Sequence, residues 1–278
     1  MTKKALATGA IGHTGSFLVH ELVNSGWKVV ATDLKQESRA KVMEKEGVFQ
    51  IGDDRLSIDL PEVTFLTADL TDKESLKALF ADDLVKDQEY DAIFHPASLY
   101  DYFAELELLR KINVGGLQNF LEVIKEHYEE KGTDIPHFLH WSTCGVYGQP
   151  NYEKTDKGYF IPTNEGAPYD PPNNYSISKM EQEKLLKEFA EKNDLKYSII
   201  RPAPIYGPYQ TYGMFHIYYM SHMIGGMMPL PHVIPRKRAL MMPMIHVEDL
   251  VRAAVFIANK PESYGEAYNL VSDSSTQE

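Results

Sequence analysis

The sequence predicts an α/β fold with a doubly wound parallel sheet, because short apolar segments alternate with amphipathic ones through its first two thirds. The apolar segments are nearly continuous, as expected of strands that are buried on both faces. We expect the crossovers between these strands to be right-handed. The expected strands are residues 4–8, 28–33, 63–67, 91–97, 137–143 and 197–202.

Amphipathic segments between these strands predict helices. In residues 14–25, Phe17, Leu18 and Leu22 share one face of a helix. Apolar residues recur at helical spacing from Leu106 to Ile124, which predicts a long central helix. Further helices are expected over residues 174–191 and 247–258.

Three segments lack clear periodicity. Residues 36–61 are charged and irregular, which indicates a surface helix and loop. Residues 151–172 contain several Pro, Asn and Gly residues and predict a long loop, and such loops in compact enzymes often lie near sites. Residues 203–245 are rich in Pro, Gly, Met and Tyr. The methionines of this segment either form a small core or line an adaptable apolar pocket.

Composition restricts the partners. The formal net charge of −12 disfavours binding to nucleic acids and anionic membranes, because their phosphates would be repelled. The single cysteine, Cys144, excludes an intrachain disulfide and suits a reducing compartment. No apolar segment reaches the length of a transmembrane helix and the N-terminus has no signal peptide, so we expect a cytoplasmic protein. The expected partner is a small-molecule substrate. The histidines show no metal-ligand spacing, so no metal is expected.

A glycine-rich turn follows the first expected strand and opens the first helix. Gly9, Gly12 and Gly15 allow the backbone to pass close to a pyrophosphate, and the helix N-terminus offers free N–H groups and partial positive charge. The spacing G-x-x-G-x-x-G differs from the commoner G-x-G-x-x-G. This position in the chain favours a dinucleotide site on a Rossmann-type sheet over an ordinary turn.

Two acidic positions fit the adenosine half of such a ligand. Asp33 ends the second strand, where a carboxylate accepts hydrogen bonds from ribose hydroxyls and repels a 2′-phosphate. The alternative is an Asp that caps a turn. Asp69 and Leu70, after the third strand, are placed to hold the adenine, although Asp also caps many helices. Asp33 therefore predicts a preference for NAD over NADP.

Tyr175 and Lys179 are four residues apart, so a helix places them on one face about a turn apart. Tyrosine is a weak base at neutral pH because its ordinary pKa is about 10, and a neighbouring ammonium favours the phenolate. Such a tyrosine can exchange a proton with a substrate hydroxyl while hydride moves to or from a cofactor. The alternative is a surface lysine beside a half-buried tyrosine.

Ser142 and Thr143 end the strand that precedes this helix, and a hydroxyl at the carboxyl edge of a parallel sheet points into the ligand crevice. It either hydrogen-bonds the reacting oxygen or caps a loop. Cys144 follows directly and is expected to be a small packing residue, because no base is paired with it.

These motifs resemble those of the extended short-chain dehydrogenase/reductase family, which includes NAD-dependent sugar-nucleotide epimerases, dehydratases and 3β-hydroxysteroid dehydrogenases. The resemblance runs from end to end. Besides the residues named above, it rests on the segments His95–Ser98, Asn113–Val114, Ser142–Gly148, Arg201–Pro208 and His246–Leu250.

The resemblance implies roles for the matching residues. Thr143 would polarise the substrate, Tyr175 would be the acid/base, and Lys179 would bind the nicotinamide ribose and lower the pKa of the tyrosine. Ala97 would lie against NAD, and Pro202 and Ile205 would contact its nicotinamide side. The family also implies a homodimer through the helices that contain Asn113 and Tyr175.

The resemblance also implies a domain division. Residues 1–205, with 246–260 returning, would form the NAD-binding domain, and residues 206–278 a small substrate-binding lobe. Relatives usually continue further, so we expect either a truncated chain or an unusually small lobe. The gap between Thr143 and Tyr175 is longer than is typical, which places an insertion at residues 151–166. Pro96 stands where many relatives have an apolar side chain.

The leading hypothesis is an NAD-dependent oxidoreductase acting on a secondary alcohol or ketone, and the alternative is a sugar-nucleotide epimerase. The complete set of Thr143, Tyr175 and Lys179 argues against a non-catalytic NAD sensor. Dehydration is disfavoured because Cys144 and Gly145 stand where dehydratases carry an Asp-Glu pair.

A bulky apolar substrate is expected for two reasons. Residues 239–245 lack the Arg that commonly meets the diphosphate in sugar-nucleotide enzymes, and residues 98–102 resemble the hydroxysteroid dehydrogenase branch. The basic run 236–238 is either a solvated loop or the missing cation.

Overall fold

A computed structural model describes residues 2–34, 57–148, 156, 163–210, 213 and 243–272. Its main sheet has seven parallel strands in the order β3-β2-β1-β4-β5-β6-β9. This is the doubly wound order, which confirms the expected Rossmann-type fold. The strands are β1 (Lys4–Thr8), β2 (Lys28–Asp33), β3 (Val63–Thr67), β4 (Ala92–His95), β5 (His137–Trp141), β6 (Tyr197–Pro202) and β9 (Ala267–Leu270).

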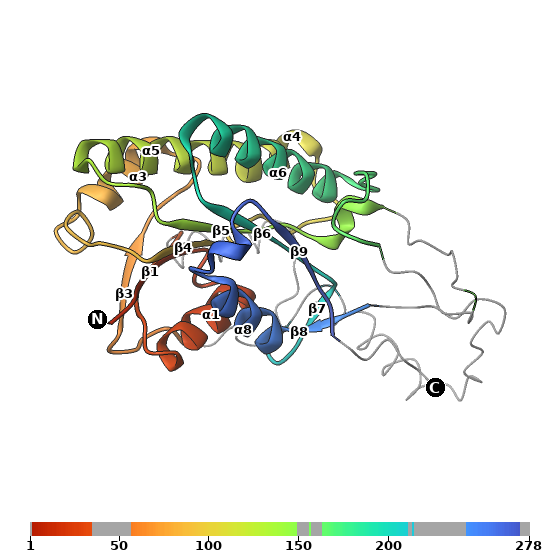
Figure 1. The fold of residues 1–278 in the computed structure, drawn as a ribbon, viewed down its shortest axis with the longest axis horizontal. Helices are drawn as coiled ribbons and strands as arrows, with labels where there is room; N and C mark the ends of the chain where they lie inside the picture. Colours follow the sequence, from red (N-terminus) through yellow and green to blue (C-terminus); the bar gives the residue numbers. More distant parts are fainter. Residues whose placement is uncertain are drawn as a thin grey trace.

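Helices cover both faces of this sheet (Figure 1). The ribbon places α3, α4, α5 and α6 on one face and α1 and α8 on the other. Two apolar clusters fill the two interfaces, one containing Leu18 and Leu250 and the other Phe120 and Leu186. The α-helices are α1 (His13–Asn24), α3 (Lys73–Ala81), α4 (Leu106–Leu109), α5 (Gly115–Lys131), α6 (Asn174–Asn193) and α8 (Val247–Ile257).

Two strands end earlier than the sequence indicated. The expected strand 91–97 is only Ala92–His95, since Pro96 has no N–H with which to continue the ladder. The expected strand 137–143 ends at Trp141, because Thr143 turns to cap the short 3₁₀ helix η2 (Cys144–Tyr147). In both places the chain leaves the sheet at the carboxyl edge, where a ligand crevice forms in this fold.

The expected long central helix is interrupted. Between α4 and α5 lies a π-helical segment, η1 (Arg110–Val114), which contains the buried Asn113. Single-turn π segments within helices are frequent at functional sites. Here the amide of Asn113 pairs with both backbone groups of Leu99 and with Ser178 Oγ, which joins η1 to the loop after β4 and to α6.

The part of the chain that returns to the main sheet is longer than residues 246–260. Strand β9 pairs with β6, so residues 267–270 also belong to this layer. A separate pair of strands, β7 (Ile205–Tyr206) and β8 (Ile245–His246), joins the segments on either side of residues 207–244. A second 3₁₀ helix, η3 (Pro261–Ser263), precedes β9.

Other expectations fall partly or wholly outside the described residues. These are most of segment 36–61, the methionine-rich segment and the basic run 236–238. The lobe 206–278 therefore stays a prediction. Residues 163–172 of the expected long loop contain no helix or strand. Within the described part of the chain, no helix has both the length and the apolar character needed to cross a bilayer.

Candidate active site

The structure brings the predicted site residues to one edge of the main sheet, because the carboxyl ends of parallel strands meet there. Open α/β sheets bind ligands at this edge, where the strand order reverses between β1 and β4. The residues that follow or end successive strands are Gly9 after β1, Asp33 at the end of β2, Asp69 after β3, Ala97 after β4, Thr143 after β5 and Pro202 at the end of β6.

The glycine turn is packed too tightly to accept side chains. Gly9 has a φ of 63°, and a Cβ there would lie 2.7 Å from the Cα of Ala97. A Cβ on Gly15 would lie 1.9 Å from the carbonyl oxygen of Gly9. Gly12 is the N-cap of α1 and makes no side-chain cap, so this helix presents its first N–H groups to the edge. Such a turn fits a pyrophosphate.

Asp33 joins the end of β2 to the glycine turn. Its carboxylate accepts hydrogen bonds from the N–H groups of Ile11, at 3.0 Å, and Leu34, at 2.7 Å. Asp33 therefore caps this turn, as the alternative interpretation expects. The same contacts place a negative charge beside the turn, where an adenosine ribose would lie in this fold.

Asp69 and Leu70 lie at the neighbouring strand end. Asp69 accepts hydrogen bonds from the backbone N–H and hydroxyl of Thr71, at 2.8 and 2.7 Å, so it shapes its own turn. The side chain of Leu70 packs against Gly116 of α5, and Asn119 donates to its carbonyl oxygen at 3.0 Å. Contact of this pair with an adenine stays a prediction.

Tyr175 and Lys179 occupy the buried face of α6, with 7% and 1% of their surfaces exposed. No hydrogen bond or ion pair joins Lys179 Nζ to another described residue. Burial lowers the pKa of Lys179 to about 7, although the charge of Glu183 acts in the opposite direction. A buried ammonium with no hydrogen-bond acceptor among the described residues is suited to donate to the ribose hydroxyls of a nicotinamide nucleotide.

Two buried histidines, to which the sequence assigns no role at this site, lie beside Lys179. His95 of β4 and His140 of β5 are paired in register and stacked, with ring centroids 5.7 Å apart. Burial and the charge of Lys179 lower the pKa of His95 to about 3 and that of His140 well below its ordinary value. Both rings are therefore neutral at physiological pH and add no positive charge.

The hydroxyls of Ser142 and Thr143 have different partners. Ser142 Oγ donates to the carboxylate of Glu183 in the interior. Thr143 Oγ1 accepts the N–H of Gly145 at 3.1 Å and so caps η2. Thr143 therefore caps a loop, and this hydrogen bond fixes the position of its hydroxyl. The hydroxyl proton can still be donated to a ligand. Thr143, which is only partly buried, is better placed than Ser142 to meet a substrate.

The two residues after Thr143 do not supply an acid pair. Burial raises the pKa of the Cys144 thiol to about 11, so it is neither a thiolate nucleophile nor a base at neutral pH. A Cβ at Gly145 would lie 2.6 Å from Ser176 Oγ, so a longer side chain would not fit without displacing α6.

A buried polar network, which the sequence analysis missed, lies behind this strand end. Arg201 of β6 forms a bidentate pair with Glu183 of α6, through Nε to Oε1 at 2.9 Å and Nη2 to Oε2 at 2.6 Å. Tyr169 also donates to Glu183, at 2.7 Å, and the guanidinium hydrogen-bonds Tyr147 and Tyr169. One sequence signal could have pointed to Glu183: Tyr175, Lys179 and Glu183 are spaced four residues apart, so a helix places all three on one face.

The loop after β4 presents aromatic rings beside Tyr175. Tyr100 and Tyr102 meet its ring edge-on, with centroids 5.0 and 5.5 Å away, and are 39% and 46% exposed. A Cβ at Gly213 would lie 3.4 Å from the Tyr100 hydroxyl, so Gly213 lies beside the same ring. The two tyrosines thus form an aromatic wall next to the predicted acid/base.

The remaining predicted residues complete this edge. Pro202 is buried at the end of β6 and pairs in register with Leu270. Ile205 pairs with Ile245 in the small sheet and packs against the apolar cluster under α1 and α8. His13 at the start of α1 hydrogen-bonds the carbonyl oxygen of Pro208 at 2.8 Å, which ties the glycine turn to the same segment.

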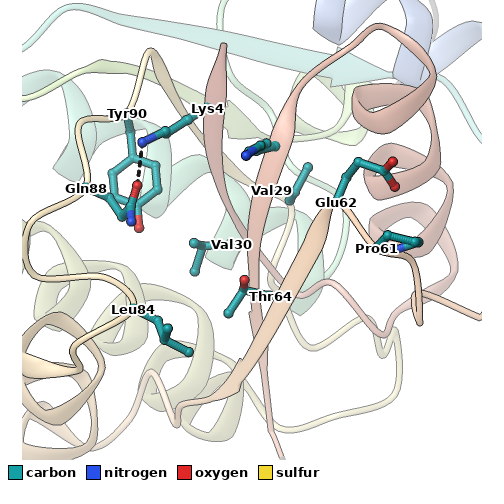
Figure 2. A pocket seen from close by; sticks show the side chains of 10 residues that line it. Lys4, Val29, Val30, Pro61, Glu62, Thr64, Leu84, Gln88 and Tyr90 are labelled. Carbon is teal, nitrogen blue, oxygen red and sulfur yellow. Dashed lines mark hydrogen bonds between the residues drawn. The ribbon is translucent and has the colours of Figure 1, made fainter. Parts of the chain in front are cut away.

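A hollow lies at the opposite edge of the sheet (Figure 2). It is lined by residues at the amino ends of β1, β2 and β3, including Lys4, Lys28 and Glu62. Lys4 Nζ, shown in Figure 2, is already paired with Gln88 at 2.6 Å. Because the predicted site residues lie at the carboxyl ends of the strands, this hollow is a separate feature.

Comparisons with known proteins agree with this fold. A model of the NAD dependent epimerase/dehydratase family matches residues 5–270. The putative UDP-glucose 4-epimerase of Methanocaldococcus jannaschii is 25% identical over 209 residues, which is 74% of this chain and 57% of that protein. Anthocyanidin reductase of Arabidopsis thaliana is 27% identical over an alignment of 288 positions that covers 96% of this chain and 77% of that protein.

A solved structure shows the same fold. The UDP-glucose 4-epimerase of Thermotoga maritima, with UDP-glucose, superposes with a TM-score of 0.69 at 24% identity, over 97% of this chain and 77% of that one. The sheet edge, the glycine turn and the Tyr175–Lys179 helix are in keeping with the short-chain dehydrogenase/reductase type that the sequence predicts.

The chain belongs to the NAD dependent epimerase/dehydratase family, and NAD is its cofactor. The family expected from the sequence is confirmed, and the hydroxysteroid dehydrogenase branch stays a prediction. The chain spans 57% of the length of the M. jannaschii relative.

Proposed function

We propose that this chain is an NAD-dependent oxidoreductase that transfers hydride at a secondary alcohol or ketone of a bulky, largely apolar substrate. The observation that carries the proposal is the placement of Tyr175 and Lys179 on the buried face of α6, at the sheet edge that also holds the glycine turn. A dinucleotide held by that turn would extend across this edge towards α6.

The residues present fit NAD in three places. Gly9, Gly12 and Gly15 would hold the pyrophosphate, Asp33 the adenosine ribose and Lys179 the nicotinamide ribose. Ala97, Pro202 and Ile205 would lie against the nicotinamide half, and Asp69 and Leu70 near the adenine. NAD, when bound, supplies the hydride acceptor, or as NADH the hydride donor.

The proton then moves on this chain's own residues. Tyr175 takes a proton from the substrate hydroxyl in oxidation and returns it in reduction, while Thr143 donates a hydrogen bond to the same oxygen. The Lys179 ammonium stabilises the phenolate form of Tyr175 through charge. The aromatic wall of Tyr100 and Tyr102 excludes water from one side of the reacting groups.

The same wall supports an apolar substrate. Two half-exposed tyrosine rings beside the acid/base offer apolar area to a flat or ring-shaped ligand, and aromatic contacts add to area burial. The similarity to a reductase over 96% of the chain is in keeping with this proposal. Dehydration is disfavoured by the raised pKa of Cys144 and the crowding at Gly145.

Sugar-nucleotide epimerisation is the second candidate, and the similarity to UDP-glucose 4-epimerases favours it. It would use the same Tyr175, with hydride returned to the opposite face of the oxidised carbon. Such a substrate carries a diphosphate, and its desolvation needs a cation. The candidate cations Arg236 and Arg238 lie outside the described residues.

One titration tests the proposal. UDP- and dTDP-sugars are added to the NAD-loaded protein beside a panel of sterol-like and other apolar alcohols. We expect NADH formation with apolar secondary alcohols and no binding of nucleotide sugars. Micromolar binding of a nucleotide sugar, lost on substituting Arg236 or Arg238, would reverse the ranking and make the epimerase the better proposal.

A matched pair of variants tests the wall itself. Tyr102→Ala removes a ring that contacts Tyr175, whereas Phe103→Ala removes one from the same loop that is 97% exposed. We expect Tyr102→Ala to raise KM for an apolar alcohol roughly tenfold through lost contact area. Phe103→Ala should leave KM unchanged, and equal effects of the two variants would argue against the wall.

A further inference from the structure

Glu183 is the most highly connected carboxylate in the described interior. It is fully buried on α6, one turn beyond Lys179 and two beyond Tyr175. Arg201 pairs with it through two hydrogen bonds, and Tyr169 and Ser142 each donate one more. These bonds hold the carboxylate in its charged form, and hydrogen bonds from Arg201 lower its pKa against the opposing effect of burial.

This connectivity exceeds what is needed to satisfy a buried arginine. Arg201 could be paired by any carboxylate within reach, and a buried pair of this kind is weak evidence for stability. The position on α6 is what sets Glu183 apart, because residues four apart on a helix are neighbours on one face. Two lysines lie one turn away on that face: Lys187, which is 41% exposed and has its Nζ 3.8 Å from the Glu183 carboxylate, and Lys179, which is buried at the proposed cofactor site.

We propose that Glu183 is a positioning residue for the cofactor site: held by Arg201, Tyr169 and Ser142, its carboxylate faces the Lys179 ammonium and keeps that ammonium charged for the ribose of the cofactor. The inference rests on the proposed role of Lys179. It assigns to the Glu183–Arg201 pair a function in cofactor binding, beyond holding β6 to α6.

The charged and titratable groups around Lys179 support this role. On α6 these are Tyr175 and Glu183, on β4 His95 and on β5 His140. Both histidines are neutral, so Glu183 supplies the negative charge in this set. Burial lowers the pKa of Lys179 to about 7, and Glu183 is the group that raises it. Without Glu183, Lys179 would lose its proton at a lower pH.

The test is the pH dependence of NADH binding, followed by the fluorescence of NADH itself. A protonated Lys179 donates to ribose hydroxyls, so affinity should be high below its pKa and fall above it. Glu183→Gln/Arg201→Met removes both charges together, which avoids leaving a lone buried charge. We expect this variant to lose affinity at a pH lower by about one unit or more than the wild type does.

Three controls accompany this variant. Ser142→Ala removes one hydrogen bond of the network and keeps the carboxylate, so its midpoint should match the wild type. Glu183→Gln alone is measured in parallel, so that the result does not depend on one variant folding. Lys179→Met should abolish the pH dependence.

The outcomes separate the two proposals. A sloping wild-type profile with an unshifted midpoint in both Glu183 variants overturns the role of Glu183 and leaves that of Lys179 intact. An equal shift in Ser142→Ala also overturns it, because disruption of the network would then explain the effect. A wild-type profile as flat as that of Lys179→Met contradicts the assignment of Lys179 and, with it, this inference.

Discussion

The carbonyl oxygen of Gly9 occupies the space that a side chain on Gly15 would need, with 1.9 Å between that oxygen and an ideal Cβ. The first turn of α1 therefore packs directly on the turn that leaves β1. This close approach requires glycine at position 15, and it sets the position of the helix N-terminus that we propose binds pyrophosphate.

Gly15→Ala should therefore weaken both folding and cofactor binding. We expect a loss of about 1–3 kcal/mol in the free energy of unfolding, as for overpacked sites, together with a large loss of NAD affinity. Gly115→Ala is the matched control, because its Cβ would meet its nearest neighbour at 3.6 Å. That variant should gain up to about 1 kcal/mol, as alanine does in helices. Urea unfolding measures the stability of both variants, and NADH titration measures their affinity. Normal NADH binding by Gly15→Ala would contradict the proposal that the glycine turn binds the pyrophosphate.

The choice between NAD and NADP is expected to depend on Asp33. Its carboxylate lies beside the glycine turn through its bond to Ile11 N–H, and a 2′-phosphate placed there would be repelled. The protein should bind NAD more tightly than NADP. Asp33→Asn should narrow this difference without abolishing NAD binding. Dissociation constants for both cofactors decide the point, and equal or tighter binding of NADP by the wild type would refute it.

Acid stability should depend on His140, whose two ring nitrogens have no hydrogen-bond partner in the described interior. Its pKa is lowered by burial, so below pH 6.5 the unfolded chain takes up a proton that the folded chain refuses. The folded state therefore loses stability as pH falls from 6.5.

His140→Leu should remove this contribution. Relative to the wild type, the variant should gain up to about 1.4 kcal/mol for each pH unit below 6.5. Chemical denaturation at pH 7 and at pH 5 measures the effect. If the difference between variant and wild type is the same at both pH values, His140 is not held neutral by the fold.

Local sequence patterns were sufficient to predict most of the sheet and the chemistry at its edge. The strands at 4–8, 28–33, 63–67 and 197–202 have the predicted bounds, because continuous apolar runs mark buried parallel strands. The motif residues from Gly9 to Pro202 converge because each follows or ends a strand. In contrast, β9 was not predicted, since its four residues are all only partly buried and include a polar Asn269.

What the sequence did not reveal depends on contacts between distant segments. The Glu183–Arg201 pair joins residues 18 positions apart on different elements, and a helix pattern alone does not show which charged residue is buried. For Asp33 and Thr143 the structural and functional alternatives do not exclude each other, because both side chains cap turns at the edge where a ligand would bind. In both residues the hydrogen bonds of the cap hold the carboxylate or hydroxyl at that edge.

Single-turnover kinetics of the wild type and Tyr175→Phe, with NAD and an apolar secondary alcohol, measure whether Tyr175 controls hydride transfer. The substitution deletes the transferable proton and keeps the ring that packs against Tyr100. We expect NADH formation to fall by about a hundredfold or more with NAD affinity nearly unchanged, whereas Lys179→Ala should lower both. Normal turnover by Tyr175→Phe would show that Tyr175 is not the acid/base.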